Sequence, residues 1–332
     1  MFDATNVITD FEGIIFMGDT HIASGRVGRR IDDYAAAGLD KLRQAAAVSR
    51  TRKLFPVHLG DLFHRAKEND LPLLMRMMAV LREFPTPPLV VAGSHDRNES
   101  WFTDKDAAQL LEDAGVIHLL ETPGQVATLN CAGTKVRIFV TPAGVAVPTS
   151  VPIDKNSFTV MVTHHDFDFN GKYPGAHELH EIVGCDLMVN GHMHTTTPMV
   201  LKGNTACHNP GSMLRVSVDL KKHEPAVSIW TPKHSINLER HPLVYGAHVF
   251  DMTGKEVFAA DPKMLKESLP KGLRLSSFAA KLRGSDELEA TRSDDGAGMI
   301  EELDKYFKLF EKPDNLKRYL TGLLAEVIAA KA

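Results

Sequence analysis

The sequence predicts an α/β protein whose strands are buried between layers of helices, and two observations support this fold class. In roughly the first third of the chain, short apolar runs bounded by turn residues alternate with segments of helical periodicity. Such alternation is typical of βαβ units. Farther along, strand-like runs follow one another with few helices between them. This second part favours either a mixed sheet or a two-sheet sandwich with helices outside.

The first part of the chain supplies the alternating elements. Strands are predicted from short apolar runs at residues 13–19, 54–61, 88–94 and 116–120. Helices are predicted from apolar residues at helical spacing in residues 29–48, 71–84 and 104–115. The last of these helices ends in Gly115, and glycine is typical of a helix C-terminus.

The second part begins near Val126 and is dominated by strands. They are predicted at residues 135–142, 158–165, 186–194, 198–203 and 226–232. One short helix is expected near residues 175–184, and no internal repeat is visible.

After about His241 the composition becomes less apolar, which indicates a change of domain. We therefore expect a main domain at residues 1–240, a small capping region at 241–295 and a C-terminal helical pair at 296–332. Apolar side chains recur at helical spacing in that pair. Such faces either pack on the protein's own core or dock a partner protein.

The composition restricts the class of protein. Hydrophobic residues make up 43% and charged residues 24% of the chain, so we expect a globular protein with a sizeable core. A net charge of −4 argues against a surface that is basic overall, although a local groove or bound cations could still contact nucleic acid.

The cysteines and the N-terminus indicate the compartment. Cys131, Cys185 and Cys207 lie far apart, which predicts a reducing compartment and argues against a thiolate metal site. The apolar stretch at residues 13–17 is too short to span a bilayer, and no targeting segment precedes it. We therefore expect a cytoplasmic protein with no membrane association.

Polar side chains with metal-binding chemistry follow five of the predicted strands. Because the carboxyl ends of parallel strands meet at one edge of a sheet, we expect these side chains to line one crevice. Imidazole and carboxylate ligands without thiolate suit Mn²⁺, Fe²⁺ or Zn²⁺, and their number predicts two ions. The pairs are Asp19 with His21, Asp61 with His64, His95 with Asp96, His164 with His165, and His192 with His194.

The order of these motifs resembles the calcineurin-like metallophosphoesterase superfamily over residues 13–215. Within it, the segments GDLFH, GSHDR and NPGSMLR are similar to the SbcD-type nucleases of DNA double-strand-break repair and their phage counterparts. The resemblance implies a two-sheet β-sandwich flanked by helices and a small C-terminal appendage. It also implies two divalent ions, with Mn²⁺ favoured over Mg²⁺, Fe²⁺ or Zn²⁺. The implied partners are DNA, as duplex ends or single strands, and an SbcC-type ATPase, and a homodimer is compatible with the resemblance.

The resemblance also implies roles for single residues. His95 would steady or protonate the scissile phosphate, and His64 would support exonuclease action on duplex ends. Ser94 stands where the family has asparagine, so a shorter and weaker ligand is expected at the second ion. The implied ligands form two sets that share Asp61: Asp19, His21, Asp61 and His194 for one ion, and Asp61, Ser94, His164 and His192 for the other.

Other polar residues are weaker candidates. Arg97 and Arg215 could contact a phosphate, and His208 could line the cleft. His165 is expected to face away from the site because neighbouring strand residues point to opposite faces. His58 lies within a predicted strand and is interpreted as a hydrogen-bonded core histidine. The segment HELHE, at residues 177–181, is interpreted as a surface helix.

The sequence thus predicts a metal-dependent phosphodiesterase that acts on DNA. One alternative is a small-substrate phosphatase or cyclic-nucleotide phosphodiesterase, against which the GDLFH and NPGS segments and the C-terminal helical pair argue. Another alternative is a scaffold subunit with weakened catalysis, which Ser94 in place of asparagine would fit. The other implied ligand positions and His95 argue against the scaffold, because loss of function rarely changes a single position.

Overall fold

The computed structural model describes residues 7–169 and 176–252. The chain divides into two compact units, Met1–Asp251 and Met252–Ala332, and the architecture below is that of the first. The predicted C-terminal helical pair and most of the predicted capping region lie outside the described residues. None of the helices in the described part of the chain has the length and apolar character needed to span a bilayer.

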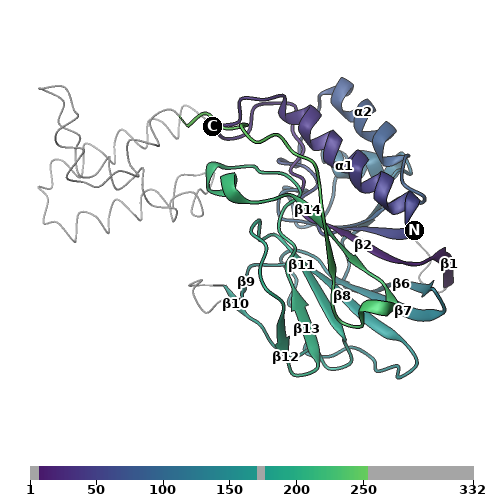
Figure 1. The fold of residues 1–332 in the computed structure, drawn as a ribbon. Coiled ribbons are helices and arrows are strands. Elements are labelled where there is room, and N and C mark those ends of the chain that lie inside the picture. The colour runs from purple at the N-terminus through teal and green to yellow at the C-terminus, as the bar shows by residue number, and fades with distance from the viewer. Residues whose placement is uncertain (1–6, 170–175, 253–332) are drawn as a thin grey trace, which may run out of the picture. The chain divides into compact units, whose positions relative to one another are not determined.

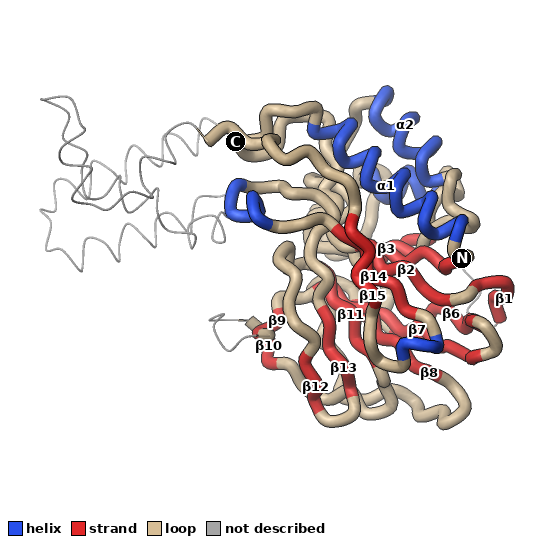
Figure 2. Tube along the Cα trace, viewed as in Figure 1, coloured by secondary structure: helices blue, strands red, loops and turns tan. Residues whose placement is uncertain are grey.

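Two large sheets form the core of the first unit (Figure 2). The smaller of them has the order β15-β14-β2-β3-β4-β5, in which β2 to β5 run parallel and β14 is antiparallel to both of its neighbours. Its six strands are β2 (Gly13–Met17), β3 (Leu54–His58), β4 (Leu89–Val91), β5 (His118–Leu120), β14 (Ala226–Trp230) and β15 (Glu239–Pro242).

The second sheet has seven strands in the order β1-β6-β7-β8-β11-β13-β12. Strands β7, β8, β11 and β13 run parallel, whereas β12 closes one edge in the antiparallel direction. Its strands are β1 (Val7–Phe11), β6 (Gly124–Cys131), β7 (Thr134–Thr141), β8 (Phe158–His164), β11 (Leu187–Gly191), β12 (Val200–Lys202) and β13 (Thr205–His208). Two short 3-10 helices, η1 and η2, cover Val218–Lys222 and Pro232–His234.

Three helices connect the parallel strands of the six-stranded sheet: α1 (Tyr34–Thr51), α2 (Leu71–Leu81) and α3 (Ala107–Asp113). The first two begin where an aspartate accepts a hydrogen bond from a free backbone N–H of the first turn. Asp33 accepts from Ala36 N at 2.9 Å, and Asp70 accepts from Leu73 N at 2.7 Å. These N-caps set where the helices begin. Helix α1 begins at Tyr34, after its predicted start at residue 29, and α2 begins at its predicted start, Leu71.

The inner faces of the two sheets pack against each other. Phe16 of β2 and Val57 of β3 belong to the same apolar cluster as Ile138 of β7 and Val162 of β8. A second apolar cluster fills the outer face of the six-stranded sheet beneath the helices, and Figure 1 shows α1 beside α2 over that sheet. The predicted fold class, a two-sheet sandwich flanked by helices, is confirmed.

The prediction of a helix near residues 175–184 is wrong. His177–Glu178 forms β10, which pairs in parallel with β9 (Phe167–Asp168). Leu179 and Ile182 are buried in a third apolar cluster, with residues from the outer face of the seven-stranded sheet. Their spacing of three resembles one helical turn, but tertiary packing buries both from a segment that is neither helix nor strand, so the surface helix interpreted from HELHE is absent as well.

The first unit continues past the boundary expected at residue 240. That boundary falls inside β15, which pairs with β14. Beyond it, Leu243 and Phe250 are buried, and Asp251 N donates to Arg29 O at 2.8 Å. The described residues after β15, up to Asp251, therefore pack with the first unit.

Candidate metal centre

Strand ends from both sheets meet at one place in the molecule. Strands β2 and β3 of the six-stranded sheet lead into Asp19 and Asp61, whereas β8 of the seven-stranded sheet ends at His164. His164 Nε2 lies 3.3 Å from Asp61 Oδ1, so side chains of the two sheets are in direct contact there. We predicted a crevice at one edge of a single sheet. The structure forms it instead from the edges of both sheets.

Within the described part of the chain, three groups of side chains are close enough to hold a metal ion. In each group, one potential ligand atom from every residue lies within 4.8 Å of the others. We call the two groups that contain a carboxylate the inner clusters and the group of histidines alone the outer cluster. The inner clusters are Asp19, His21 and His194, and Asp61, His164 and His192; the outer cluster is His21, His64 and His95.

Asp61 connects the two inner clusters. Its Oδ1 lies 3.3 Å from Nε2 of His164, and its Oδ2 lies 3.5 Å from Nε2 of His21. The two oxygens of one carboxylate thus face histidines of different clusters. Because each carboxylate oxygen has its own lone pairs, this arrangement suits a carboxylate shared by two ions.

Unsatisfied polar atoms show that the inner clusters fit divalent ions. Among the described residues, Asp19 Oδ2 and His164 Nε2 are buried and have no hydrogen-bond partner, although buried polar atoms normally have one. His164 Nδ1 donates to Leu59 O at 2.7 Å, which leaves Nε2 as the ring nitrogen that faces Asp61. Nitrogen and oxygen donors without sulfur suit a borderline divalent ion.

The backbone adopts unusual conformations at three of these positions. His21, Asp61 and His192 have φ angles of 46°, 52° and 75°, in the left-handed region that residues with a Cβ rarely adopt. Each such residue costs on the order of 1–3 kcal/mol, and such strain persists only where the surrounding structure enforces it. Its presence at three candidate ligands indicates that their placement matters more than local stability.

Glycines allow the strand ends to approach one another. A Cβ on Gly93 would clash with the backbone N and with Oδ1 of Asp61, so β4 can lie beside the turn after β3 only without a side chain there. Gly60 has a φ of 103°, and a Cβ on it would clash with His164 Nδ1. These contacts explain why a glycine comes directly before Asp61 and Ser94.

Asp96 supports the turn that carries Asp61, a role that sequence reasoning missed. Its buried carboxylate accepts hydrogen bonds from Leu62 N at 2.8 Å, Phe63 N at 3.2 Å and Gly93 N at 3.0 Å. These bonds tie the turn after β3 to the end of β4. A carboxylate beside a histidine was visible in the sequence, but nothing there distinguished a backbone acceptor from a metal ligand.

A pair of asparagines, also missed, holds the loop that carries His192 and His194. Asn209 Nδ2 donates to Met193 O at 2.8 Å and to Thr195 O at 2.9 Å. Asn190 Nδ2 donates to Asn209 Oδ1 at 3.2 Å, which joins β11 to this loop. Both side chains are buried, so their hydrogen bonds make the loop part of the rigid core.

The sequence pattern of the calcineurin-like phosphoesterase family matches residues 13–196, more than half of the chain. The chain belongs to the calcineurin-like phosphoesterase family. The sequence-based assignment to this superfamily is confirmed, and the candidate ligands all lie within the matched segment. Phosphoesterases of this family are hydrolases that act on phosphoester bonds and use divalent metal ions.

The solved structures to which this chain is similar include two bacterial proteins. One is a hypothetical protein from Thermus thermophilus, with 12% identity and a TM-score of 0.41. The other is a predicted phosphoesterase from Streptococcus pneumoniae, with 13% identity and a TM-score of 0.28. Each similarity covers 70% of this chain and 98% of the other. No curated protein matches this chain significantly.

Burial and mutual charge shift the pKa values of the phosphoesterase site. Burial raises the pKa of Asp19 to about 7, against the attraction of His164, and raises that of Asp96 to about 6. Burial also disfavours the charged Asp61, but His164 and His21 outweigh it and hold the pKa of that carboxyl well below its usual range. The carboxyl groups of Asp19, Asp61 and Asp96 are buried close together, and this arrangement favours a positively charged group or ion between them.

The histidines respond to burial in two ways. Burial alone would lower the pKa of His164, but the carboxylates of Asp61 and Asp19 raise it to about 10. Burial lowers the pKa of His192 and of His194 to about 4. Both are therefore neutral near pH 7, which is the form of imidazole that binds metals.

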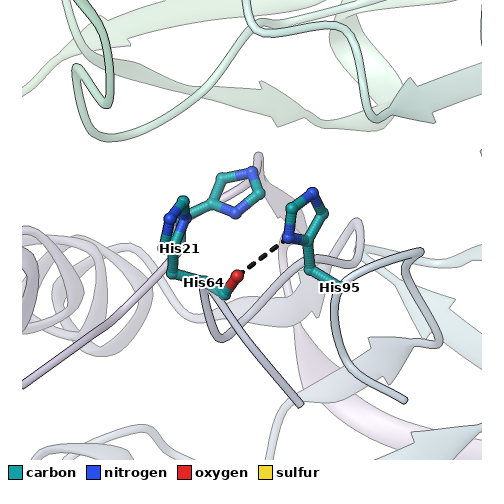
Figure 3. A group of neighbouring side chains, drawn as sticks. All are labelled: His21, His64 and His95. Atoms are coloured by element: carbon teal, nitrogen blue, oxygen red, sulfur yellow. Dashed lines mark hydrogen bonds between the residues drawn. The ribbon is translucent and has the colours of Figure 1, made fainter. Parts of the chain in front are cut away.

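His64, Ser94 and His95 lie beside the inner clusters. Ser94 Oγ donates to Asp61 Oδ2 at 3.4 Å, and His95 N donates to Asp61 Oδ1 at 2.8 Å. The side chain of His95 is exposed, and its Nδ1 donates to His64 O at 2.8 Å (Figure 3). The structure thus brings the three residues to the site, and their chemical roles stay predictions.

The three weaker substrate candidates make their hydrogen bonds elsewhere. Arg215 is buried, donates to Lys221 O at 2.9 Å and lies over the ring of Tyr245, so it ties the end of the first unit together. Arg97 donates to Ala143 O at 3.0 Å. The side chain of His208 pairs with that of Ser228 at 3.1 Å.

Two other histidines behave as the sequence predicted. His165 Nε2 donates to Val145 O at 2.7 Å and points away from His164. His58 is buried in β3 and is hydrogen-bonded to Thr20 Oγ1 at 3.1 Å. The alternation of side chains along a strand therefore correctly predicted that His165 faces away from His164.

Proposed function

We propose that this phosphoesterase is a metal-dependent DNA nuclease of the SbcD type. The observation that carries the proposal is a pair of histidines, the exposed His95 and the half-buried His64, that adjoins the inner clusters. A second support is the set of segments GDLFH, GSHDR and NPGSMLR. Asp61, His64 and His95 come from the first two, and Met213 N of the third donates to Asp19 O at 3.1 Å.

The residues that would hold two divalent ions are those of the inner clusters, with Asp61 shared and Ser94 at the second ion. When bound, such ions activate water for attack on phosphorus and offset the charge of the phosphoryl group. Mn²⁺ is the proposed ion because it accepts imidazole and carboxylate ligands together. Asp61 is oriented for sharing by the hydrogen bonds that it accepts from His95 N and Ser94 Oγ.

His95 is the proposed general acid. Its Nδ1 proton is held by His64 O, so Nε2 is the ring nitrogen that can carry a proton to the leaving oxygen of the broken phosphodiester bond. Its exposure leaves room for a polymer, since a DNA strand can reach the ring from solvent. His64, beside it, is proposed to contact the backbone of the same strand near a duplex end.

An SbcC-type ATPase is the proposed partner of this nuclease. The proposal is supported by the apolar residues at helical spacing in residues 296–332. Those residues lie outside the described part of the chain, so the support comes from the sequence pattern. A homodimer and a cytoplasmic location remain sequence-based predictions.

The purified protein with Mn²⁺ should be incubated with linear duplex DNA, single-stranded DNA, a chromogenic phosphodiester and a cyclic nucleotide. We expect DNA to be degraded with the highest kcat/KM, and His64→Ala to lower duplex degradation far more than hydrolysis of the chromogenic diester. Preference for the cyclic nucleotide or the small diester would instead identify a small-substrate phosphodiesterase. Absence of any hydrolysis, with ions bound, would identify a scaffold.

A further inference from the structure

The outer cluster has the spacing of a metal site of its own. The ring centroid of His21 lies 5.6 Å from that of His64 and 4.8 Å from that of His95, and the last two are 5.7 Å apart. Imidazole nitrogens held about 2.1 Å from a tetrahedral ion would be about 3.4 Å apart. The ligand atoms here lie within 4.8 Å of one another, the limit that the inner clusters also meet. Figure 3 shows the three side chains grouped together.

Each histidine of the outer cluster keeps a ring nitrogen that the inner clusters do not use. His21 Nε2 faces His194 Nε2 at 2.8 Å, whereas His21 Nδ1 is buried without a hydrogen-bond partner among the described residues. His64 Nδ1 is also buried and unpartnered there. His95 uses Nδ1 for its bond to His64 O, so its Nε2 is left. Two unpartnered buried nitrogens in one cluster call for a ligand.

The ligand chemistry of the outer cluster differs from that of the inner clusters. Each inner cluster contains a carboxylate, whereas the outer cluster contains imidazoles alone. Imidazole suits Zn²⁺, Ni²⁺ and Cu²⁺, which bind nitrogen sites more strongly than Mn²⁺ does. We propose that His21, His64 and His95 form a third cation site, selective for a borderline ion such as Zn²⁺, with an open position toward solvent.

Occupation of this site would prevent two histidines from contacting substrate. A cation on His95 Nε2 occupies the nitrogen that is proposed to protonate the leaving oxygen. The same cation binds His64, which then cannot contact the DNA backbone. Zn²⁺ would therefore inhibit by competing with DNA. This competition rests on the proposed function, whereas ion binding does not.

The number of ions bound to the full-length protein tests the site. After equilibrium dialysis against Zn²⁺ and Mn²⁺ together, the total metal per chain is measured by elemental analysis. We expect three ions in the wild type and two in each of the variants His95→Asn and His64→Asn. The exposed His248 offers a matched control, so His248→Asn should retain three. Counting all metals together makes the result independent of Zn²⁺ replacing Mn²⁺ in the inner clusters. Equal numbers in all four proteins would overturn the proposal.

A second dialysis separates this inference from the proposed function. With a short DNA duplex present, the wild type should lose the third ion and keep two, because the duplex and the ion need the same histidines. A third ion that the duplex leaves in place would overturn the competition while the cation site stands. If the wild type binds only two ions without DNA and still degrades DNA, the third cation site is overturned and the proposed nuclease function stands.

Discussion

At the scale of single residues, Asp61 connects the two inner clusters. One side chain faces histidines from two inner clusters and accepts hydrogen bonds from Ser94 and His95. The left-handed backbone at Asp61 and the clash that a Cβ on Gly93 would cause show how closely the surrounding structure fits this carboxylate. Its replacement should therefore affect both clusters together.

We predict that Asp61→Asn lowers hydrolysis of a phosphodiester by more than about 100-fold and reduces the number of bound ions at both inner clusters. An amide carries no charge, so the stabilisation of several kcal/mol that bound ions provide would be lost. Elemental analysis and initial rates measure the two effects. The exposed Asp113, which accepts from Gln109 Nε2 on α3, gives the matched control Asp113→Asn. Activity close to wild type in the Asp61 variant would contradict a shared carboxylate.

Ser94 leads to a prediction in the opposite direction. Its hydroxyl is shorter than an asparagine side chain and a poorer donor to a cation than an amide carbonyl. We expect Ser94→Asn to shift the Mn²⁺ dependence of activity to lower concentration, while Ser100→Asn, an exposed serine of the same loop, leaves it unchanged. Titration of activity with Mn²⁺ decides the matter. Equal or weaker Mn²⁺ affinity in the Ser94 variant would show that another group completes the second site.

At the scale of elements, the turns after the strands hold the site in place. Asp96 joins the turn after β3 to the end of β4 through three backbone N–H groups. Asp96→Ala leaves these donors unsatisfied in a buried place, and we predict a loss of about 2–4 kcal/mol in the free energy of unfolding. Urea denaturation measures it, with Asp113→Ala as the exposed control. A loss below about 0.5 kcal/mol would mean that water satisfies the donors.

A histidine on β13 should make the fold sensitive to acid. Burial lowers the pKa of His208 to about 4, from about 6.5 in an unfolded chain. The native state therefore favours the neutral ring, so its contribution to stability is complete above pH 6.5 and is lost as the pH falls toward 4. We predict that His208→Gln flattens the decline in stability over that range by up to about 3 kcal/mol. Unfolding curves at several pH values measure the slope, and equal slopes would contradict the shift.

At the scale of the whole molecule, the site depends on the first compact unit, Met1–Asp251. Every residue of the inner and outer clusters lies within it, and so does the family match at residues 13–196. Removal of residues in the second unit should therefore leave the chemistry of the phosphoesterase intact.

We predict that deletion of residues 296–332 leaves a folded, Mn²⁺-dependent phosphoesterase that no longer binds the proposed ATPase. The reason is that the apolar faces of this segment would serve the partner and not the first unit. Thermal unfolding, diester hydrolysis and co-purification with the partner measure the three properties. Aggregation or a lowered Tm of the truncated chain would indicate that these faces belong to the protein's own core.

The sequence by itself determined the α/β class, most strand positions and the residues that meet at the site. Strand ends can be predicted because apolar runs and the glycines after them are local signals, as at Gly60 before Asp61. Strand alternation, also local, separated His164 from His165.

Only the tertiary structure decided how the two sheets combine at the centre and what some polar residues do. The contact of His164 with Asp61 joins strands of different sheets, and their pairing across the sandwich leaves no signal in a single sequence. Asp96 and Asn209 use their side chains on backbone groups of other turns, and Arg215 bonds to Lys221 O. Residues 179–182 are not helical, because burial of Leu179 and Ile182 against the seven-stranded sheet outweighs their local spacing of three.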